Sequence, residues 1–469
     1  MSLNRVDRLV RQTLRGVFAA IAGVACLSAS GVAAGEPGLA IAAFNVDATP
    51  PMGTPLCDAL CQPASSVDDP LSARGVVLLP AGEKAVVLAA VDWSGIGNEG
   101  QDEWRAALAE AAGTTVDRVA VHALHQHDAP GCDFLADKIA SEHGLGGKLF
   151  GVEFARQTIA RTAEAVKAAA AEPTPVTHVS AGVGVVDKVA SNRRILGPDG
   201  KVKFERMSSC RNPEVIAQPE GTIDPNARAV GFWSGDEPVV VLTYYATHPQ
   251  SYYCKGRVSA DFVGMARAMR EKALPGPAHV HFNGAGGNVA AGKYNDGSPE
   301  NRPILASRLA AGMAAAWNAA EKLPLEGVDV QWDSRDVALP PAAHLDEQSL
   351  LTIIDNPQEL EAARLRAVRH LAFLRRCQAG HKITVSRLRI GNVDLLHLPG
   401  ELFVEYQLAA QAMRPDSIVC TAAYGDYGPG YIGLHDAYSQ GGYETSDRAS
   451  RVAPQVESVL MTAMQELLK

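Results

Sequence analysis

Residues 119–131 read VAVHALHQHDAPG, and they join an apolar strand to a turn that carries two histidines. The run 119–123 has the composition of a buried strand, and Pro130 and Gly131 turn the chain after it. Since residues i and i+2 of a strand face the same side, we expect His125 and His127 to point into one pocket at a sheet's end. Imidazole is both a metal ligand and a proton shuttle near neutral pH. Taken alone, however, such a pair more often forms two partly buried loop histidines.

The composition is that of a globular protein, with 47% hydrophobic and 20% charged residues in a chain of 469. This composition excludes a disordered or fibrous protein. A chain of this length can form one large domain or two or three average ones. The net charge of −9 provides no basic surface, so we expect no nucleic-acid partner.

The first 35 residues have the pattern of a secretory signal peptide. Four arginines between residues 5 and 15 precede an apolar run at 17–32 and the small residues Ala33-Ala34-Gly35. The apolar run is short for a membrane span, which needs about 20 residues. An uncleaved anchor and lipidation at Cys26 are the less favoured alternatives. We therefore predict export to the periplasm or the extracellular space.

Export permits disulfides, and seven cysteines lie beyond residue 35. Because seven is odd, at least one of them is free or paired outside the chain. Cys57 and Cys61 could bond to each other or to distant partners, and the sequence leaves the pairing open.

The expected fold class is α/β (α+β): one large domain at 36–469, with a mixed β-sheet core flanked by helices. Hairpins are expected at 75–91 and 383–398. Further strands are expected at 36–43, 119–123, 176–185, 239–245, 278–282, 328–337 and 418–422. Helices are expected at 104–112, 154–171, 260–273, 303–320, 358–377, 402–413 and 451–468. The sequence shows no internal repeat.

Polar loops follow several of these strands, as is typical of functional sites. His248 follows the apolar strand 239–245, a glycine-rich loop at 283–292 follows strand 278–282, and Glu401 follows strand 393–398. With His125 and His127 they supply three histidines and a glutamate, which suits zinc. The glycine loop lacks the Lys-Ser/Thr of a P-loop. The metallo-β-lactamase and His-Glu-x-x-His patterns are absent.

Several segments together resemble the neutral, non-lysosomal ceramidase family. Residues 125–131 resemble its His-Thr-His-Ser-Gly-Pro-Gly motif, and 246–248 and 259–264 resemble its Ala-Thr-His and Ser-(Gly/Ala)-Asp-x-x-Gly segments. The other matching segments are Asn192-Arg193, Pro399-Gly400-Glu401, Tyr431-Ile432, Tyr438, Tyr443-Glu444 and DATPPMGTPL at 47–56. The resemblance extends from about residue 40 to near the end of the chain.

The resemblance implies a zinc-dependent amidohydrolase that acts on linear amides in lipid, and specifically sphingolipid, metabolism. It implies one zinc ion per chain, with the ligands His125, His248, Glu401 and Tyr431. His127 would be the acid/base, while Arg193 and Tyr443 would hold the substrate's carbonyl or head group. Zinc lowers the pKa of bound water toward about 7 and polarises the carbonyl. The substrate would be a small or lipid N-acyl compound, and peripheral membrane contact is compatible with this.

Two departures from the family pattern bear on the substrate. Ala290 stands where the family's glycine loop has a serine, so a serine nucleophile is excluded there and catalysis would rest on the metal and His127. We also expect no C-terminal immunoglobulin-like domain, because the expected helix at 451–468 ends the sequence. The alternatives are a related metal hydrolase of another amide or ester, and a catalytically silent binding protein, which Ala290 would favour.

Overall fold

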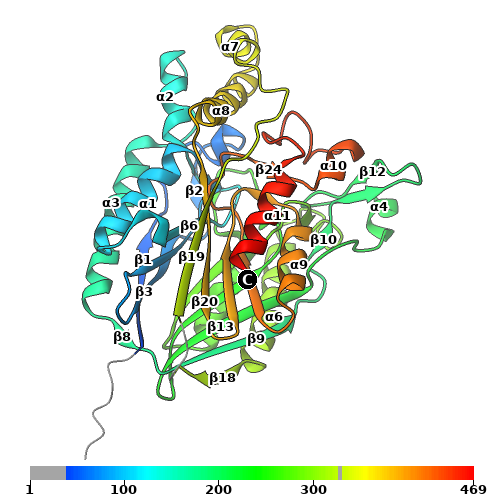
Figure 1. The fold of residues 1–469 in the computed structure, drawn as a ribbon. Coiled ribbons are helices and arrows are strands. Elements are labelled where there is room, and N and C mark those ends of the chain that lie inside the picture. The colour runs from blue at the N-terminus through cyan, green and yellow to red at the C-terminus, as the bar shows by residue number, and fades with distance from the viewer. Residues whose placement is uncertain (1–37, 326–329) are drawn as a thin grey trace, which may run out of the picture. The chain divides into compact units, whose positions relative to one another are not determined.

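The computed structural model describes residues 38–325 and 330–469. The predicted signal peptide at 1–35 lies outside the described residues. Among the described helices, none has the length and apolar character needed to cross a bilayer. The fold is a mixed α/β arrangement of several sheets flanked by helices, which confirms the predicted fold class (Figure 1).

The first large sheet has the strand order β6-β4-β3-β1-β8. Its elements are β1 (Leu39–Asp47), β3 (Ser72–Pro80), β4 (Val86–Val91), α1 (Glu99–Ala111), β6 (Val119–Ala123) and β8 (Thr174–Pro175). β1, β3 and β4 pair antiparallel, whereas β4 and β6 are parallel and are joined through α1.

The second and third sheets repeat this plan. The second sheet contains β9 (His178–Val185), β13 (Asn226–Ser234), β14 (Glu237–Tyr245), α5 (Asp261–Ala273), β16 (Ala278–Asn283) and the edge strand β18 (Glu321–Pro324). The third contains β19 (Val330–Val337), β20 (Ile383–Ile390), β21 (Val393–His397), α9 (Val404–Met413) and β23 (Ile418–Ala422). In both sheets three antiparallel strands lead through a helix to a fourth strand parallel to the third.

A topological repeat that the sequence does not display is therefore present three times. In each unit the third and fourth strands are parallel, so their carboxyl ends lie at the same edge of the sheet. The loops that follow β6, β14, β16 and β21 carry the polar segments singled out in the sequence, and those that follow β4 and β23 end at the same edges. The fold thus directs six strand ends toward one region, as ligand sites of open α/β sheets require.

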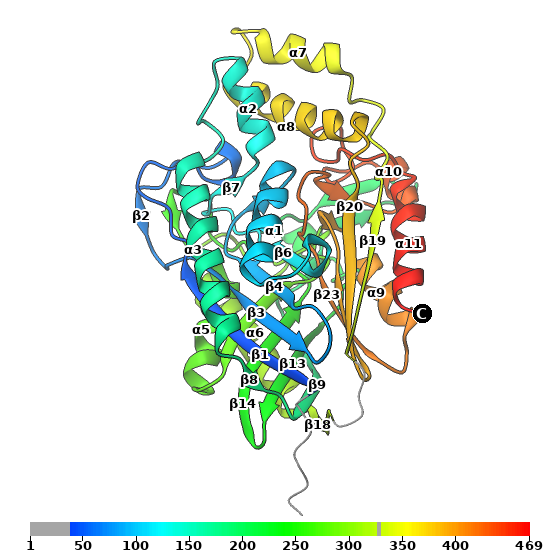
Figure 2. The same cartoon turned by 60° about the vertical axis from the view of Figure 1, so that its left-hand side comes forward.

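The three sheets pack against one another around a shared apolar core. Val76 and Leu88 from the first sheet, Phe232 from the second and Leu395 from the third belong to this core. The outer faces are covered by helices, with α3 (Val152–Ala171) on the first sheet and α6 (Asn301–Asn318) on the second (Figure 2). Burying each large apolar side chain contributes about 1.5–3 kcal/mol.

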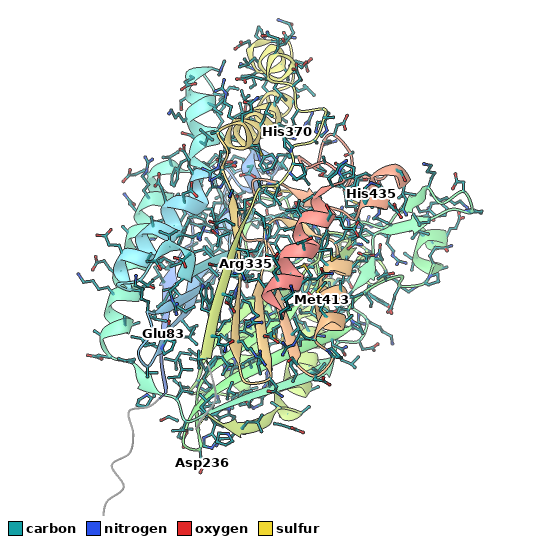
Figure 3. All side chains as sticks on the ribbon, viewed as in Figure 1. Glu83, Asp236, Arg335, His370, Met413 and His435 are labelled. Carbon is teal, nitrogen blue, oxygen red and sulfur yellow. A yellow bond between two sulfur atoms is a disulfide. The ribbon has the colours of Figure 1, made fainter. Side chains whose placement is uncertain are left out.

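The remaining elements are short or peripheral. The helices are α2 (Phe134–Glu142), α4 (Pro213–Ala217), α7 (Glu347–Asp355), α8 (Glu361–Gln378), α10 (His435–Gln440) and α11 (Val456–Leu467), with the 3-10 turns η1 (Cys57–Ala59) and η2 (Val116–Arg118). The short strands are β2 (Ser66–Val67), β5 (Gly95–Ile96), β7 (Gly131–Cys132), β10 (Ser191–Asn192), β11 (Arg194–Leu196), β12 (Val202–Glu205), β15 (Arg257–Val258), β17 (Val289–Ala290), β22 (Glu401–Leu402) and β24 (Tyr431–Ile432). Asp236, in the β13–β14 turn, lies at the end of the described domain opposite to His370 on α8 (Figure 3).

Backbone hydrogen bonds join the three sheets where their fourth strands end. The amide of Ala123 donates to the carbonyl of Tyr424 at 3.0 Å, and that of Ala423 donates to Asn283 at 2.9 Å. The side-chain amide of Asn283 closes the ring by donating to the carbonyl of Leu124 at 2.6 Å. These bonds fix the positions of the loops that follow.

His122 in β6 adds a hydrogen bond to this junction, and its contribution to stability depends on pH. Its Nδ1 lies 2.7 Å from the carbonyl oxygen of Ala423, and burial lowers the pKa of His122 from 6.5 to about 4. The unfolded chain therefore binds one more proton between these values, so stability present above pH 6.5 is lost as the pH falls toward 4.

We predict that lowering the pH from 7 to 5 reduces the unfolding free energy of the wild type by about 2 kcal/mol more than that of His122→Asn. The variant keeps a side-chain donor for the carbonyl of Ala423 but has no group that titrates in this range. Urea unfolding at the two pH values measures this difference. His435→Asn, at a side chain that is 65% exposed, is the control and should keep the wild-type dependence. An identical pH dependence in His122→Asn and the wild type would contradict the prediction.

Candidate metal centre

His125 lies just after β6, and its backbone fixes the direction of its ring. The residue has a φ of 66°, in the left-handed region that costs a non-glycine residue conformational energy. Its Nδ1 lies 2.6 Å from the carbonyl oxygen of Ser94, so Nδ1 carries the proton and donates. The lone pair of Nε2 is then free, and this buried atom has no hydrogen-bond partner among the described residues.

His248 is oriented in the same manner from the second sheet. It follows β14, and its Nδ1 donates to the carbonyl of Gly286 at 2.6 Å. Its Nε2 lies 2.9 Å from Oε2 of Glu401 and 3.0 Å from the hydroxyl of Tyr431. Burial lowers the pKa of His248, and the charge of Arg193 lowers it as well, so the ring is neutral near pH 7.

Glu401 and Tyr431 come from the third sheet's loops as neighbours in a small parallel pair. β22 and β24 place Glu401 directly opposite Tyr431. The Glu401 side chain is 1% exposed, and its Oε1 accepts a hydrogen bond from the Tyr427 hydroxyl at 2.8 Å. The hydrogen bond from Tyr427 and the positive charge of the nearby Arg193 guanidinium favour the charged form of the Glu401 carboxyl group. The carboxyl group is therefore ionised.

The side chains of His125, His248 and Glu401 form a set of possible ligands for a metal ion, called the donor set below. Oε2 of Glu401 lies 3.2 Å from Nε2 of His125 and 2.9 Å from that of His248. Neither contact contains a proton when both histidines are protonated on Nδ1, so electron-rich atoms converge in a buried space. The ligand atoms of His125, His248 and Glu401 all lie within 4.8 Å of one another. Two imidazole nitrogens and a carboxylate fit a catalytic zinc site, with the Tyr431 hydroxyl alongside.

Arg193 borders this donor set and forms an ion pair with Glu444. Its Nη1 donates to the Tyr431 hydroxyl at 3.0 Å and approaches Nε2 of His248 at 3.2 Å. Its Nε lies 3.0 Å from Oε1 of Glu444, which is fully buried. Burial alone would lower the pKa of Arg193, but Tyr431 and Glu444 raise it, so the guanidinium stays charged. Tyr443 packs edge-on against Tyr431 with ring centroids 5.7 Å apart.

His127 lies next to His125 but outside the donor set. The two ring centroids are 5.1 Å apart, and the ring of Tyr253 also lies 5.1 Å from that of His127. Although part of His127 is exposed, desolvation of its ring and the nearby His125 lower its pKa well below the ordinary value. The two histidine rings therefore lie side by side. The strand alternation expected for them is wrong, because β6 ends at Ala123 and a left-handed turn follows at His125.

A second group of possible ligand atoms surrounds His127. Cys57 and Cys61 have their sulfur atoms within 4.8 Å of a His127 nitrogen. Cys61 is bonded to Cys254, which resolves the pairing left open by the sequence in favour of a distant partner. The disulfide removes one thiolate from this group, and burial raises the pKa of the Cys57 thiol far above its ordinary value. This second group is consequently a poor metal site.

The glycine loop brings strands together and does not form a phosphate cradle. A Cβ on Gly287 would lie 2.2 Å from the backbone oxygen of Glu401, and one on Gly286 would lie 2.7 Å from the backbone of Thr247. Small residues are thus required where the His248 and Glu401 loops meet. Ala290, buried in β17, pairs with Ser191 of β10.

Sequence reasoning missed residues that act behind the donor set. Tyr427 and Glu444 hold Glu401 and Arg193, and Glu444 had a signal only as part of a matched segment. The carbonyls of Ser94 and Gly286 had none, because backbone partners leave no residue-type signature.

A narrow cavity of about 60 Å³ reaches Glu401, Tyr427, Tyr431 and Tyr443. Asp58 and Leu60 line it on one side, whereas Cys57 and Cys61 of the same loop face His127. The cavity is a route by which a small group can reach the donor set. His127 is not part of its lining.

Fold and site together define a mixed α/β protein with a buried His-His-Glu centre suited to a divalent metal. No family model matches the chain, and no curated protein matches it. Among solved structures it is similar to a ceramidase complexed with C2, at 17% identity and a TM-score of 0.66, over 92% of this chain and 75% of that one. It is also similar to the neutral ceramidase from Pseudomonas aeruginosa, at 18% identity and a TM-score of 0.66, over 92% and 74%. The chain therefore has the neutral ceramidase fold.

We predict that the purified protein binds one divalent metal ion per chain and that His125→Ala and His248→Ala each weaken this binding by about 100-fold or more. Elemental analysis after dialysis against a weak chelator measures the bound metal. His435→Ala, at an exposed position, should retain it. Full metal content in both ligand variants would show that the ion binds elsewhere.

Proposed function

We propose that the chain is an exported, zinc-dependent hydrolase of the neutral ceramidase family that cleaves an N-acyl amide bond. The observation that carries this proposal is the convergence of two imidazole Nε2 atoms and an ionised carboxylate in a buried space without a proton between them. A cation would satisfy that arrangement. The sequence resemblance and the structural similarity both point to neutral ceramidases.

The residues divide into ligands and groups that act on the substrate. His125, His248, Glu401 and Tyr431 would hold the zinc ion. When bound, zinc supplies Lewis acidity that polarises a carbonyl and lowers the pKa of water. In the net reaction the carbonyl carbon gains the water oxygen and the carbon–nitrogen bond breaks. The nitrogen leaves as an amine after taking a proton.

His127 is the proposed acid/base for this proton transfer. Its ring is neutral near pH 7, so it can accept a proton from water and later deliver it to the leaving nitrogen. Its contact with His125 places it beside the donor set without making it a ligand. Arg193 and Tyr443 are the proposed partners of the carbonyl oxygen, because a fixed guanidinium and a phenol can stabilise developing negative charge.

Ala290 favours a second candidate, a catalytically silent binding protein on the same scaffold. The proposed hydrolysis does not need a hydroxyl at this position, since water is the nucleophile. The intact set of charged and titratable groups around Glu401 supports the enzyme over the silent scaffold. A related metal hydrolase that acts on another amide or ester remains an outcome of the test.

Export is supported by the pattern of residues 1–35 and by one structural feature. The Cys61–Cys254 disulfide joins positions 193 residues apart. Disulfides persist in the periplasm and outside the cell and are rare in the reducing cytosol. We propose the periplasm or the extracellular space as the site of action, with peripheral membrane contact if the substrate is a lipid.

We predict that the zinc-loaded protein releases fatty acid from an N-acyl substrate panel that includes N-acylsphingosine and N-acyl amino acids. His127→Ala should lower kcat by about 10²–10⁴-fold and keep its zinc, because the side chain moves protons but binds no metal. Steady-state kinetics and zinc analysis of the same preparation measure both quantities, with His435→Ala as the control.

Two outcomes would contradict this assignment. Loss of zinc in His127→Ala would show that the roles of His125 and His127 are exchanged. A zinc-loaded wild type that hydrolyses no amide or ester in the panel would favour the silent binding protein.

A further inference from the structure

The cavity that leads to Glu401 is surrounded by arginines. Four of its lining residues are arginines. Arg366 and Arg369 belong to α8, whereas Arg448 and Arg451 lie in the segment between α10 and α11. His370, the neighbour of Arg369 on α8, is labelled in Figure 3. Segments far apart in the sequence thus converge on one opening.

The positive charge of this cavity exceeds its negative charge. Among the lining residues, Asp58 and Glu401 are the acids that face the four arginines. Asp58 pairs with Arg369 at 2.9 Å, and Glu401 is engaged by the two ligand histidines. A metal ion at Glu401 would add further positive charge. This excess is unexpected in a chain whose net charge is −9.

Two of the arginines have no structural partner that accounts for them. Arg366 and Arg448 form no ion pair and no side-chain hydrogen bond with any residue that the structure describes, although Arg366 is partly buried. Such side chains are free to bind a ligand. Burial lowers the pKa of Arg366, and Arg448 nearby lowers it as well, which shows that the two charges repel each other.

Arg451 gives an independent sign that an acceptor is missing. It is 5% exposed, and its Nη1 donates to the carbonyl of Gly428 at 2.7 Å. Its Nε, also buried, has no partner among the described residues. A buried charged donor without an acceptor is costly unless a ligand completes it.

The size of the cavity limits what can enter. A cavity needs about 10–15 Å³ of free volume to hold one water molecule, so a cavity of about 60 Å³ has room for a group such as a carboxylate. Pockets that enclose whole drug-sized ligands measure roughly 300–1,000 Å³. A hydrocarbon chain would therefore remain outside this cavity, whereas a small head group fits inside it.

We propose that this arginine-lined cavity binds a carboxylate on the amine part of the substrate, so that the enzyme acts on N-acyl amino acids and not on a neutral N-acylsphingosine. Guanidinium groups bind carboxylates through paired, charge-assisted hydrogen bonds. The cavity borders Glu401 and Tyr431, which places the anion next to the metal centre. This inference rests on the proposed hydrolase function.

The test compares two amides that differ only in charge, N-octanoylglycine and N-octanoylglycinamide, on the zinc-loaded full chain. We expect the kcat/KM of the acid to exceed that of the amide by about tenfold or more. The double variant Arg366→Gln/Arg448→Gln should reduce this ratio toward one, mainly through the KM of the acid. Both positions are at least partly exposed, so the variant should fold, and thermal unfolding checks this.

Arg375→Gln is the matched control, because it removes the same charge from α8 at a residue outside the cavity that pairs with Glu347. It should leave the ratio unchanged. Equal or faster hydrolysis of the glycinamide, or a double variant that keeps the wild-type ratio, would overturn the inference and leave the hydrolase function standing.

If neither amide is hydrolysed but N-acylsphingosine is, the inference is overturned and the hydrolase function stands. If N-acylsphingosine is not hydrolysed either, the proposed function fails, and calorimetric binding still tests the cavity. Binding of N-octanoylglycine that is tighter than that of the glycinamide and is weakened in the double variant would support the anion site. Equal binding of the two compounds, or no binding of either, would overturn it.

Discussion

The buried carboxylate of Glu401 is the group on which the site depends. Oε2 faces the Nε2 atoms of two imidazole rings that carry their protons on Nδ1. Oε1 accepts a hydrogen bond from the Tyr427 hydroxyl. Leaving a charge buried without a partner costs several kcal/mol in proteins. Since neither histidine supplies a proton to Oε2 in this arrangement, the three side chains could together hold a cation. Arg193 lies close enough to add positive charge but is engaged by Glu444.

The fold consists of three units that share the same topology, and the site lies where they meet. Each unit contributes the ends of two parallel strands. The three side chains of the donor set come from different units: His125 after β6, His248 after β14 and Glu401 after β21. Backbone carbonyls fix both rings, and glycines at 286 and 287 allow the second and third units to approach. The site is therefore built at a junction of sheets and not on a single loop.

Much of this could be predicted from the sequence, and the reasons for the exceptions are physical. Apolar runs located β6 within its bounds, and the ends of strands indicated His125, His248 and Glu401, because that edge of a mixed sheet collects its loops. β13 (Asn226–Ser234) was missed since Arg228 and Gly231 interrupt its apolar pattern, and the short helices α2 and α7 were missed as well. The threefold repeat is one of topology, so a single sequence does not reveal it. The arginine-lined cavity depends on how α8 packs near the segment before α11, which local patterns do not encode.

X-ray absorption spectroscopy of the zinc-loaded protein tests the central claim most directly. The account predicts a first shell of two imidazole nitrogens and carboxylate or phenolate oxygens, with Zn–N distances of about 2.0–2.1 Å and no sulfur. That spectrum would place the ion at His125, His248 and Glu401. A Zn–S contribution at about 2.3 Å would instead place the ion at the Cys57 side of His127 and would contradict the account.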